Sequence, residues 1–353
     1  MFLLVLSARA NESAFVKNEV NRAFAEAVVH RAPDGDVVLV QDYHLTLVPG
    51  LVVDARPDLR VGFFTDTPFC GPNSIRVLPT DVAEALLRSM AQVPCGFHTE
   101  RWARAYLASA REVLGPDVQP RAYAASLGPD PAELAEVAAS PGAGAALAEL
   151  DAVVRDRRMI LRIDRVEPSK NIVRGFLAYD RLLEARPGLR GRVVFLASVY
   201  PSRQDLDEYA RYTAEINEVV ARVNDRWGTR DWHPVILDDS DHFPTSLAVL
   251  RRSDVLLVNP LRDGLNLVAK EGPACNRRDG VLCLSTEAGA YEELRDAAVT
   301  VHPYDIEQTA GALDDALTLP LDERATRASH LRRLATARTP ADWLGDLVRH
   351  AGE

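Results

Sequence analysis

The sequence predicts an α/β protein made of two doubly wound domains, each with a parallel sheet between layers of helices. Short apolar runs alternate with helical patterns nearly throughout, which is typical of parallel α/β architecture. The length of 353 residues suits two domains of about 150 residues each. Residues 128–157 are rich in Ala, Gly, Pro and Glu, which indicates short surface helices and a crossing between domains. We expect domains at 1–150 and 151–337, with a C-terminal helix within 338–353 packing back on the first.

The first domain is expected to begin with a buried strand. Its opening residues 1–6 are apolar, but the run is too short to span a membrane and no basic region precedes it. The pattern predicts strands at Phe2–Leu6, Val37–Val40 and Arg60–Phe64. It predicts helices at Asn18–His30, Asp81–Gln92 and Glu100–Val113, the last capped by Thr99.

The second domain is expected to repeat the alternation with longer elements. Its predicted strands are Met159–Ile163, Val193–Ala197, Pro234–Leu237, Val255–Val258, Val281–Ser285 and Val299–His302. Its predicted helices are Ile172–Ala185, Asp205–Trp227, Ser246–Arg252, Leu265–Cys275, Ile306–Leu317 and Asp322–Ala335, with Ala341–Ala351 closing the chain. Tandem sheets of this kind bind ligands at the carboxyl ends of their strands, so we expect the two domains to face a shared cleft.

The composition excludes several classes of function. A net charge of -10 and a pI near 5.4 argue against broad contact with nucleic acid or an anionic membrane. The four cysteines stand far apart without CxxC spacing, which disfavours a zinc site or a disulfide framework and favours a reducing cytoplasm. Only three of the 41 basic residues are lysines, namely Lys17, Lys170 and Lys270. We expect a soluble cytoplasmic protein that acts on small molecules, and the sequence leaves a homo-oligomer open.

The segment Leu261–Glu271 carries the strongest chemical signal. A buried strand runs into a loop that contains Asp263 and Gly264, and a helix then opens. Free backbone N–H groups at such a helix start can hold phosphate oxygens, and Glu271, about two turns inside, could grip ribose hydroxyls. Alternatively, Asp263 caps the helix and Glu271 is solvated. A dinucleotide fingerprint is not met, because the only G-x-G, at 142–144, follows no predicted strand.

A second segment, Leu161–Asn171, ends a strand and places two cations five residues apart before a helix. Arg165 and Lys170 could together neutralise a pyrophosphate leaving group, which is the main electrostatic task in sugar transfer. On the alternative interpretation both are surface charges near a loop. Lys170 and Lys270 both lie at strand-to-helix junctions of the second domain.

Together these segments resemble the trehalose-phosphate synthases, which are retaining glycosyltransferases of the two-domain GT-B fold. The family's elements recur in order over about residues 18–350. They are Val40–Leu45, Gly62–Phe69, Gly96–Thr99, Arg165–Lys170, Pro201–Arg203, Asp263–Glu271, Leu284–Gly289, Pro303–Asp305 and Trp343. The resemblance implies a GT-B fold whose N-terminal domain is shortened, with an acceptor-side first domain and a second domain that binds a nucleotide-sugar.

The resemblance also implies a role for each matching residue. Arg165 and Lys170 would bind the donor diphosphate, Asp263 the hydroxyls of the donor sugar, and Asp42 an acceptor hydroxyl. Arg203 and Arg9 would hold the acceptor's phosphate. The remaining donor contacts would come from the main chain of Phe243 at the nucleobase, from backbone groups of Leu267, Val268, Ala269 and Lys270 at the diphosphate, and from Glu271 at the ribose. No metal or other cofactor would be needed, so Asp239–Asp241 is interpreted as a loop.

Two departures from the family bear on the acceptor. The glycine-rich donor loop and aromatic acceptor contacts expected between Arg9 and the first helix are missing. The family has a histidine near the reacting face of the transferred sugar where this chain has Asp66, and a carboxylate reverses the local charge preference. Alternatively, Asp66 caps Thr67–Phe69. His98 replaces a family glutamine, and we interpret it as a structural, hydrogen-bonded histidine.

The sequence leaves three functions open. The first is a retaining, metal-independent glycosyltransferase that uses a UDP- or GDP-sugar and a divergent acceptor in specialised, antibiotic-type metabolism. The second is a genuine α,α-trehalose-6-phosphate synthase that uses glucose 6-phosphate. The third, of another class, is a non-catalytic sugar-nucleotide-binding or regulatory subunit. We expect the first, with Arg165, Lys170, Asp263 and Asp66 as its catalytic residues.

Overall fold

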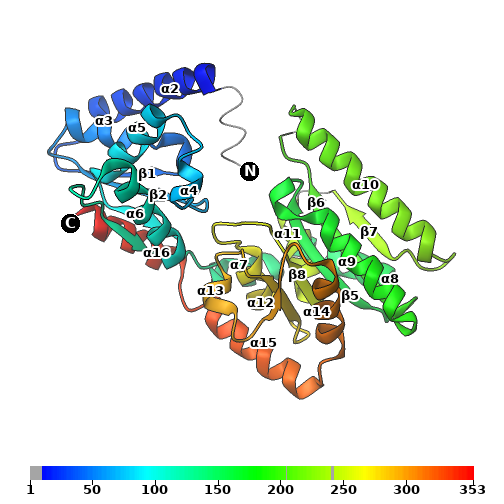
Figure 1. Cartoon of the computed structure of the whole chain (residues 1–353). Helices are drawn as coiled ribbons and strands as arrows, with labels where there is room; N and C mark the ends of the chain where they lie inside the picture. Colours follow the sequence, from blue (N-terminus) through cyan, green and yellow to red (C-terminus); the bar gives the residue numbers. More distant parts are fainter. Residues whose placement is uncertain (1–9, 204, 240–241) are drawn as a thin grey trace. The chain divides into compact units, whose positions relative to one another are not determined.

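The computed structural model describes residues 10–203, 205–239 and 242–353. Contacts divide the chain into two compact units (Figure 1). The first unit runs to Leu127 and also takes in Pro340–Glu353, and the second is Gly128–Thr339. The expected strand Phe2–Leu6 lies outside the described residues.

The first unit contains a four-stranded parallel sheet in the order β1-β2-β3-β4. Its strands are β1 (Val37–Gln41), β2 (Arg60–Thr65), β3 (Cys95–Phe97) and β4 (Ala122–Ala124). Its helices are α2 (Ala10–Arg31), α3 (Val48–Ala55), α4 (Pro72–Ile75), α5 (Thr80–Ala91), α6 (Glu100–Leu114) and α16 (Pro340–Ala351), with a 3-10 turn at Tyr43–Leu45. The sequence pattern does not predict β3, β4 and α3, because three-residue strands and an eight-residue apolar helix carry too little periodicity.

Helix α6 begins as expected. Thr99 accepts a hydrogen bond from the Trp102 N–H at 3.3 Å, so the predicted cap is confirmed. Helix α16 returns from the far end of the chain to contact β1 and β2. Its Trp343 ring packs edge-on against Phe64 of β2, with the ring centroids 5.2 Å apart. Aromatic contacts of this geometry add to the apolar area that the helix buries.

The second unit contains a six-stranded sheet in the order β10-β9-β8-β5-β6-β7, with every pair parallel. Its strands are β5 (Arg158–Arg165), β6 (Val193–Tyr200), β7 (Val235–Asp238), β8 (Val255–Val258), β9 (Val281–Ser285) and β10 (Val299–Val301). The chain builds outward from β5 in one direction and then returns to β8 on its other side. The order therefore reverses between β5 and β8, and such a switch point is where open α/β sheets bind ligands.

Helices cover both faces of this second sheet. They are α7 (Pro131–Ala138), α8 (Pro141–Val154), α9 (Ile172–Ala185), α10 (Asp207–Trp227), α11 (Phe243–Arg252), α12 (Val268–Cys275), α13 (Tyr291–Leu294), α14 (Ile306–Thr318) and α15 (Leu321–Ala335), with 3-10 turns at Pro168–Lys170 and Pro187–Leu189. Ile160 and Phe195 belong to a core that also contains side chains of α9, α10 and α14. The alternate residues, such as Leu256, are equally buried and lie toward α12. The predicted class of two doubly wound, Rossmann-like α/β units is confirmed.

The contacts place α7 and α8 in the second unit, whereas we expected the first domain to run to residue 150. Both helices pack on α11, and α7 also packs on α12. Arg251 strengthens this attachment by donating a 2.6 Å hydrogen bond to the Ala138 carbonyl. Helices α7 and α8 thus lie on a face of the second sheet. Among the described residues no single helix is long and apolar enough to cross a membrane, and only the bent pair α7 and α8 passes that test jointly, by length and composition.

Gly96 of β3 lies where the first unit leaves no room for a side chain. A Cβ there would overlap the Phe64 ring and approach Tyr123 Cζ to 2.7 Å. We expect Gly96→Ala to lower the free energy of unfolding by about 1–3 kcal/mol, the usual cost of overpacking, as measured by urea denaturation. Gly345 of α16 is the matched control, because a Cβ there meets nothing within 4 Å. Gly345→Ala should stabilise the protein by about 0.5–1 kcal/mol, and equal losses from both variants would contradict this account of the packing.

Candidate active site

The two segments singled out in the sequence lie side by side at the switch point. One follows β5 and the other follows its neighbour β8. The Leu261 N–H donates a 2.8 Å hydrogen bond to the Ser169 carbonyl, so the two loops are joined directly. Because the carboxyl ends of parallel strands meet at one edge, residues about 93 positions apart in the chain come together here.

A charged pair links the loops. Lys170 Nζ lies 2.5 Å from Asp263 Oδ2, and the two side chains are only 16% and 15% exposed. Burial lowers the pKa of Lys170 and raises that of Asp263, but their mutual attraction outweighs burial in both, so the pKa of Lys170 is raised and the pKa of Asp263 is lowered. Both groups therefore stay charged through the neutral range, and the carboxylate acts only as a hydrogen-bond acceptor.

The Asp263 loop is fixed by the segment that follows β9. The Asp263 N–H donates to the Glu287 carbonyl at 3.0 Å, and the Gly289 N–H donates to the Asp263 carbonyl at 3.1 Å. A Cβ on Gly289 would overlap the Gly264 carbonyl oxygen, so this close approach requires glycine. The alternative in which Asp263 caps the next helix is wrong, because α12 begins at Val268 with Leu267 as its N-cap.

Helix α12 starts three residues later than expected because Asn266 takes a left-handed conformation, with φ at 76°. Its side chain accepts a 3.1 Å hydrogen bond from the Ala269 N–H. The N–H groups of Lys270 and Glu271 both donate to the Leu267 carbonyl at 2.8 Å. Four residues are expected to offer backbone N–H groups to a diphosphate. The N–H groups of Ala269 and Lys270 already donate within the protein, so we expect the diphosphate contacts to come from Leu267 and Val268.

The side chains at this helix start differ in direction. Lys270 is 1% exposed, and its Nζ lies 3.0 Å from Glu293 Oε2 of α13, so its ammonium faces the interior. Glu271 lies in the first turn of α12, not two turns inside. Burial, with a smaller contribution from the charge of Glu133, raises the pKa of Glu271. A carboxyl group can accept hydrogen bonds from hydroxyl groups in either protonation state.

Arg165 reaches the same edge with a more exposed side chain. It is 52% exposed, and its Nε lies 3.3 Å from Glu167 Oε1. The Ser202 hydroxyl donates to that same oxygen at 3.3 Å, which ties the loop after β5 to the loop after β6. Arg203 follows in that second loop with an exposed side chain and φ at 46°. Arg165 thus ends β5 and Arg203 lies in the loop after β6, and Glu167 connects the segments that follow these two neighbouring strands.

Phe243 is the first residue of α11, which begins three residues earlier than expected. Pro244 in the first turn suits a helix start, because proline needs no hydrogen-bond acceptor there. Phe243 is 44% exposed and belongs to the segment between β7 and β8. Its backbone thus starts a helix on the sheet face that α12 also covers, since α11 and α12 are in contact.

The expected acceptor residues of the first unit follow β1 and β2. Asp42 follows β1 with φ at 64° and ψ at 161°, a region of backbone conformation that residues other than glycine rarely adopt. Its N–H donates to the Phe64 carbonyl at 2.7 Å, its Oδ2 lies 3.5 Å from His44 Nδ1, and its Oδ1 is buried without a partner among the described residues. Strained residues with unsatisfied polar atoms cluster at functional sites.

Asp66 follows β2 and pairs with a histidine that follows β3. Asp66 Oδ1 lies 3.1 Å from His98 Nε2, and the side chains are 52% and 4% exposed. The His98 ring packs edge-on against Phe64 with the ring centroids 4.9 Å apart. A hydrogen-bonded histidine is therefore confirmed at position 98, and Asp66 is held by it while keeping half of its surface open.

Several site groups were not identified from the sequence. Glu167 and Asn171 contact the expected residues or their loops, and His98, which we expected to be hydrogen-bonded, has Asp66 as its partner. Only the folded chain brings these partners together. Arg9 and residues 240–241 lie outside the described residues, so neither Arg9 nor the loop Asp239–Asp241 is placed. Within the ranges that the structure describes, no group of three or more His, Cys, Asp or Glu side chains is suited to hold a metal.

Comparison with known proteins matches this architecture over nearly the whole chain. Residues 6–353 match the model of Glycosyltransferase family 20. The UDP-forming α,α-trehalose-phosphate synthase of Schizosaccharomyces pombe is 33% identical over 351 residues, which are 93% of this chain and 68% of that protein.

Two solved structures are similar in fold. The UDP-forming α,α-trehalose-phosphate synthase of Burkholderia xenovorans in complex with glucose-6-phosphate has a TM-score of 0.90 at 30% identity, over 97% of this chain and 79% of that one. The trehalose-6-phosphate enzyme of E. coli bound with UDP-2-fluoro glucose has a TM-score of 0.88 at 31% identity, over 94% and 77%. This chain belongs to glycosyltransferase family 20 and is a retaining glycosyltransferase of the trehalose-phosphate synthase type.

Proposed function

We propose that the chain takes a hexosyl group from a UDP-hexose and transfers it to an acceptor hydroxyl or amine with retention of configuration. The observation that carries this proposal is the Lys170–Asp263 pair at the switch point, with Arg165 at the end of β5, five residues before Lys170. UDP is the favoured nucleotide because the relatives in the comparison are named as UDP-forming.

The two cations supply the charge that the reaction needs. When the bond between the sugar carbon and the diphosphate oxygen breaks, negative charge collects on the diphosphate. Arg165 and Lys170 would bind those oxygens and stabilise the transition state more than the ground state. Asp263, kept ionised by Lys170, would accept hydrogen bonds from donor-sugar hydroxyls. Glu271 would bind the ribose, and the backbone of Phe243 would contact the base.

Retention follows if the acceptor attacks the face of the sugar that the diphosphate leaves. The new bond forms between the acceptor's nucleophilic atom and the sugar carbon. The nucleophile's proton passes to an oxygen of the departing diphosphate, so no protein base is required. Metal independence is part of the proposal, because two protein cations replace the metal. Turnover in EDTA should therefore equal turnover in added Mg²⁺.

The acceptor proposal rests on the pair of Asp66 and His98. Asp66 is half exposed, so it adds a negative charge where a phosphorylated acceptor would need a neutral or cationic neighbour. Arg203 remains as a cation that suits an anionic group. We propose an acceptor other than glucose 6-phosphate, one with a hydroxyl-rich or cationic group toward Asp66. Glucose 6-phosphate is the second candidate, favoured by the name of the B. xenovorans complex.

The reaction is tested by product analysis. The purified chain is offered UDP-, GDP- and ADP-sugars with phosphorylated and non-phosphorylated acceptors, and the products are identified by mass spectrometry. We expect UDP release that depends on one acceptor class. A chain that binds UDP but turns over no donor with any acceptor, or with water, would contradict the proposed reaction.

Arg165→Ala should lower turnover by about 100-fold or more, because it removes one preorganised charged donor to the leaving group. The fold should stay intact, since Arg165 is half exposed. Turnover is followed as UDP release with the best acceptor of the panel. Arg222→Ala is the control, because this arginine is exposed on α10, five residues before the helix ends. Equal activity of both variants would show that Arg165 has been assigned the wrong role.

A substitution of Lys170 needs a different experimental design, because it leaves Asp263 as a buried charge without its partner. Lys170→Met should lose both turnover and stability, the latter by up to about 3 kcal/mol. Lys170→Met combined with Asp263→Asn should recover much of the stability and none of the turnover. Urea denaturation and UDP release measured on the same samples separate the two effects.

Asp66→His should shift acceptor choice toward phosphorylated compounds. The variant removes a negative charge and introduces an imidazole that can become cationic. The measurement is the ratio of kcat/KM for glucose 6-phosphate to kcat/KM for the best non-phosphorylated acceptor, which we expect to rise at least ~10-fold, or 1.4 kcal/mol. Asp66→Asn keeps the size and removes only the charge, so it should move the ratio in the same direction. An unchanged ratio in both variants would end this account of acceptor choice.

A further inference from the structure

One buried arginine of the second unit lies behind the proposed diphosphate site. Arg162 is in β5, three residues before the strand ends, and its side chain is fully buried. Its Nε and Nη2 donate to Asp164 Oδ2 at 3.1 and 2.7 Å. Burial of such a pair is costly, and replacing a buried pair by apolar groups is often neutral for stability. The pair therefore needs an explanation other than stability.

The guanidinium also holds the turn that carries Lys170. Arg162 Nη2 donates to the Lys170 carbonyl at 2.9 Å, and Nη1 donates to the Ile172 carbonyl at 3.2 Å. Asn171, the residue between these carbonyls, has φ at 61° and ψ at 37°. The turn is thus bound on both sides of a left-handed residue, a conformation that surrounding contacts must maintain.

Asn171 adds a second set of contacts to this turn. Its Nδ2 donates to the Asn259 carbonyl at 3.0 Å and to the Pro303 carbonyl at 2.7 Å. Those carbonyls belong to the segments that follow β8 and β10, so the turn after β5 is held to both. The backbone of Lys170 can hardly rotate, and the direction of its side chain toward Asp263 is set before a ligand arrives.

The neighbouring helix makes room for the guanidinium. Gly175 of α9 lies opposite Arg162, and a Cβ at that position would come within 2.5 Å of Nη1. Asn259 is also close to this point, and its Nδ2 donates to the Asn171 carbonyl at 3.4 Å. Helix, strand and loop thus all contribute contacts that fix one side chain and, through it, one turn.

We propose that Arg162 is a positioning residue for diphosphate binding, which acts by holding the Lys170–Asn171–Ile172 turn in the conformation that presents the Lys170 ammonium. Arg162 does not touch the ligand, because it is fully buried. The proposal rests on the proposed function in one respect, namely that Lys170 binds the diphosphate. Preorganised charge is what makes such a contact effective, since no reorganisation is required when the ligand binds.

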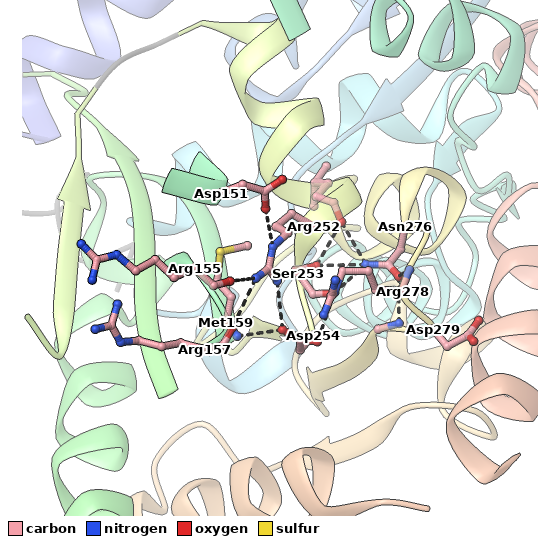
Figure 2. A network of polar contacts seen from close by, with 12 residues as sticks. Asp151, Arg155, Arg157, Met159, Arg252, Ser253, Asp254, Asn276, Arg278 and Asp279 are labelled. Carbon is pink, nitrogen blue, oxygen red and sulfur yellow. Dashed lines mark hydrogen bonds and ion pairs between the residues drawn. The ribbon is translucent and has the colours of Figure 1, made fainter. Parts of the chain in front are cut away.

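The same unit offers a matched control at the opposite edge of the sheet. Arg252, at the end of α11, is also buried, and its Nη1 lies 3.3 Å from Asp254 Oδ2. Its Nη2 donates to the carbonyls of Arg155 and Arg157 at 3.1 and 3.3 Å. Figure 2 shows this arginine at the centre of a polar network where β5 and β8 begin. It resembles Arg162 in chemistry but lies at the amino ends of the strands.

The test compares Arg162→Met with Arg252→Met by calorimetric titration with UDP and by competition with uridine, which lacks the diphosphate. We expect Arg162→Met to weaken UDP binding about 10-fold (1.4 kcal/mol) and to leave uridine binding within twofold. Arg252→Met should change neither. In the Lys170→Ala background, Arg162→Met should weaken UDP binding less than twofold, because its effect passes through Lys170. Arg162→Lys, which keeps one donor charge, should restore part of the affinity.

The outcomes distinguish a failure of the proposed function from a failure of the positioning role of Arg162. If Lys170→Ala leaves UDP affinity unchanged, the proposed function fails and the role of Arg162 fails with it. If Lys170→Ala weakens UDP binding but Arg162→Met does not, or if Arg162→Met weakens uridine equally, only the positioning role is overturned. Should Arg162→Met fold poorly, Arg162→Met with Asp164→Asn replaces it, because no lone buried carboxylate then remains. The same UDP and uridine ratios decide the question.

Discussion

The ion pair of Lys170 and Asp263 is the contact on which the candidate site depends. It joins the loops after β5 and β8, and these are the strands between which the order of the second sheet reverses. Under the proposed function, the lysine would provide charge for a diphosphate, and its partner would remain an acceptor for hydroxyl groups. Charge neutralisation and sugar recognition would then be coupled through one pair, so that a substitution of either side chain would affect the other.

Much of the fold was predictable because the elements of the second unit carry strong periodicity. The predicted bounds of α9, β8 and β9 agree with the structure at every residue, since long amphipathic helices and β-branched apolar runs leave little ambiguity. The errors fall where local conformation interrupts the pattern. Helix α12 was extended to Leu265 because its apolar spacing continues there, although the left-handed Asn266 cannot belong to a helix. Short strands such as β3 and β4 depend on their neighbours and carry no such signal.

The candidate site was predictable only in part. Arg165, Lys170 and Asp263 were identified because strand-to-loop junctions are visible in the sequence, and the structure brings the latter two into contact. The direction of Lys270 was not visible, since its ammonium pairs with Glu293 in the interior. The pairing of Asp66 with His98 depends on the lateral order of β2 and β3. Long-range contacts of this kind need a topology before they can be inferred.

Two buried arginines of the second unit, Arg162 in β5 and Arg252 in α11, show how one residue type serves different purposes at opposite ends of the strands. The Arg252 guanidinium donates to two carbonyls between the end of α8 and the start of β5, at the end of the strands opposite to the expected ligand contacts. Around Arg162, the same chemistry holds a left-handed turn beside the one lysine expected to bind a diphosphate. Stability alone would not favour a buried guanidinium at either edge. A turn that must keep one conformation for binding has a reason to retain a buried guanidinium, because its two donor bonds to the carbonyls of Lys170 and Ile172 restrain the backbone more narrowly than apolar packing does.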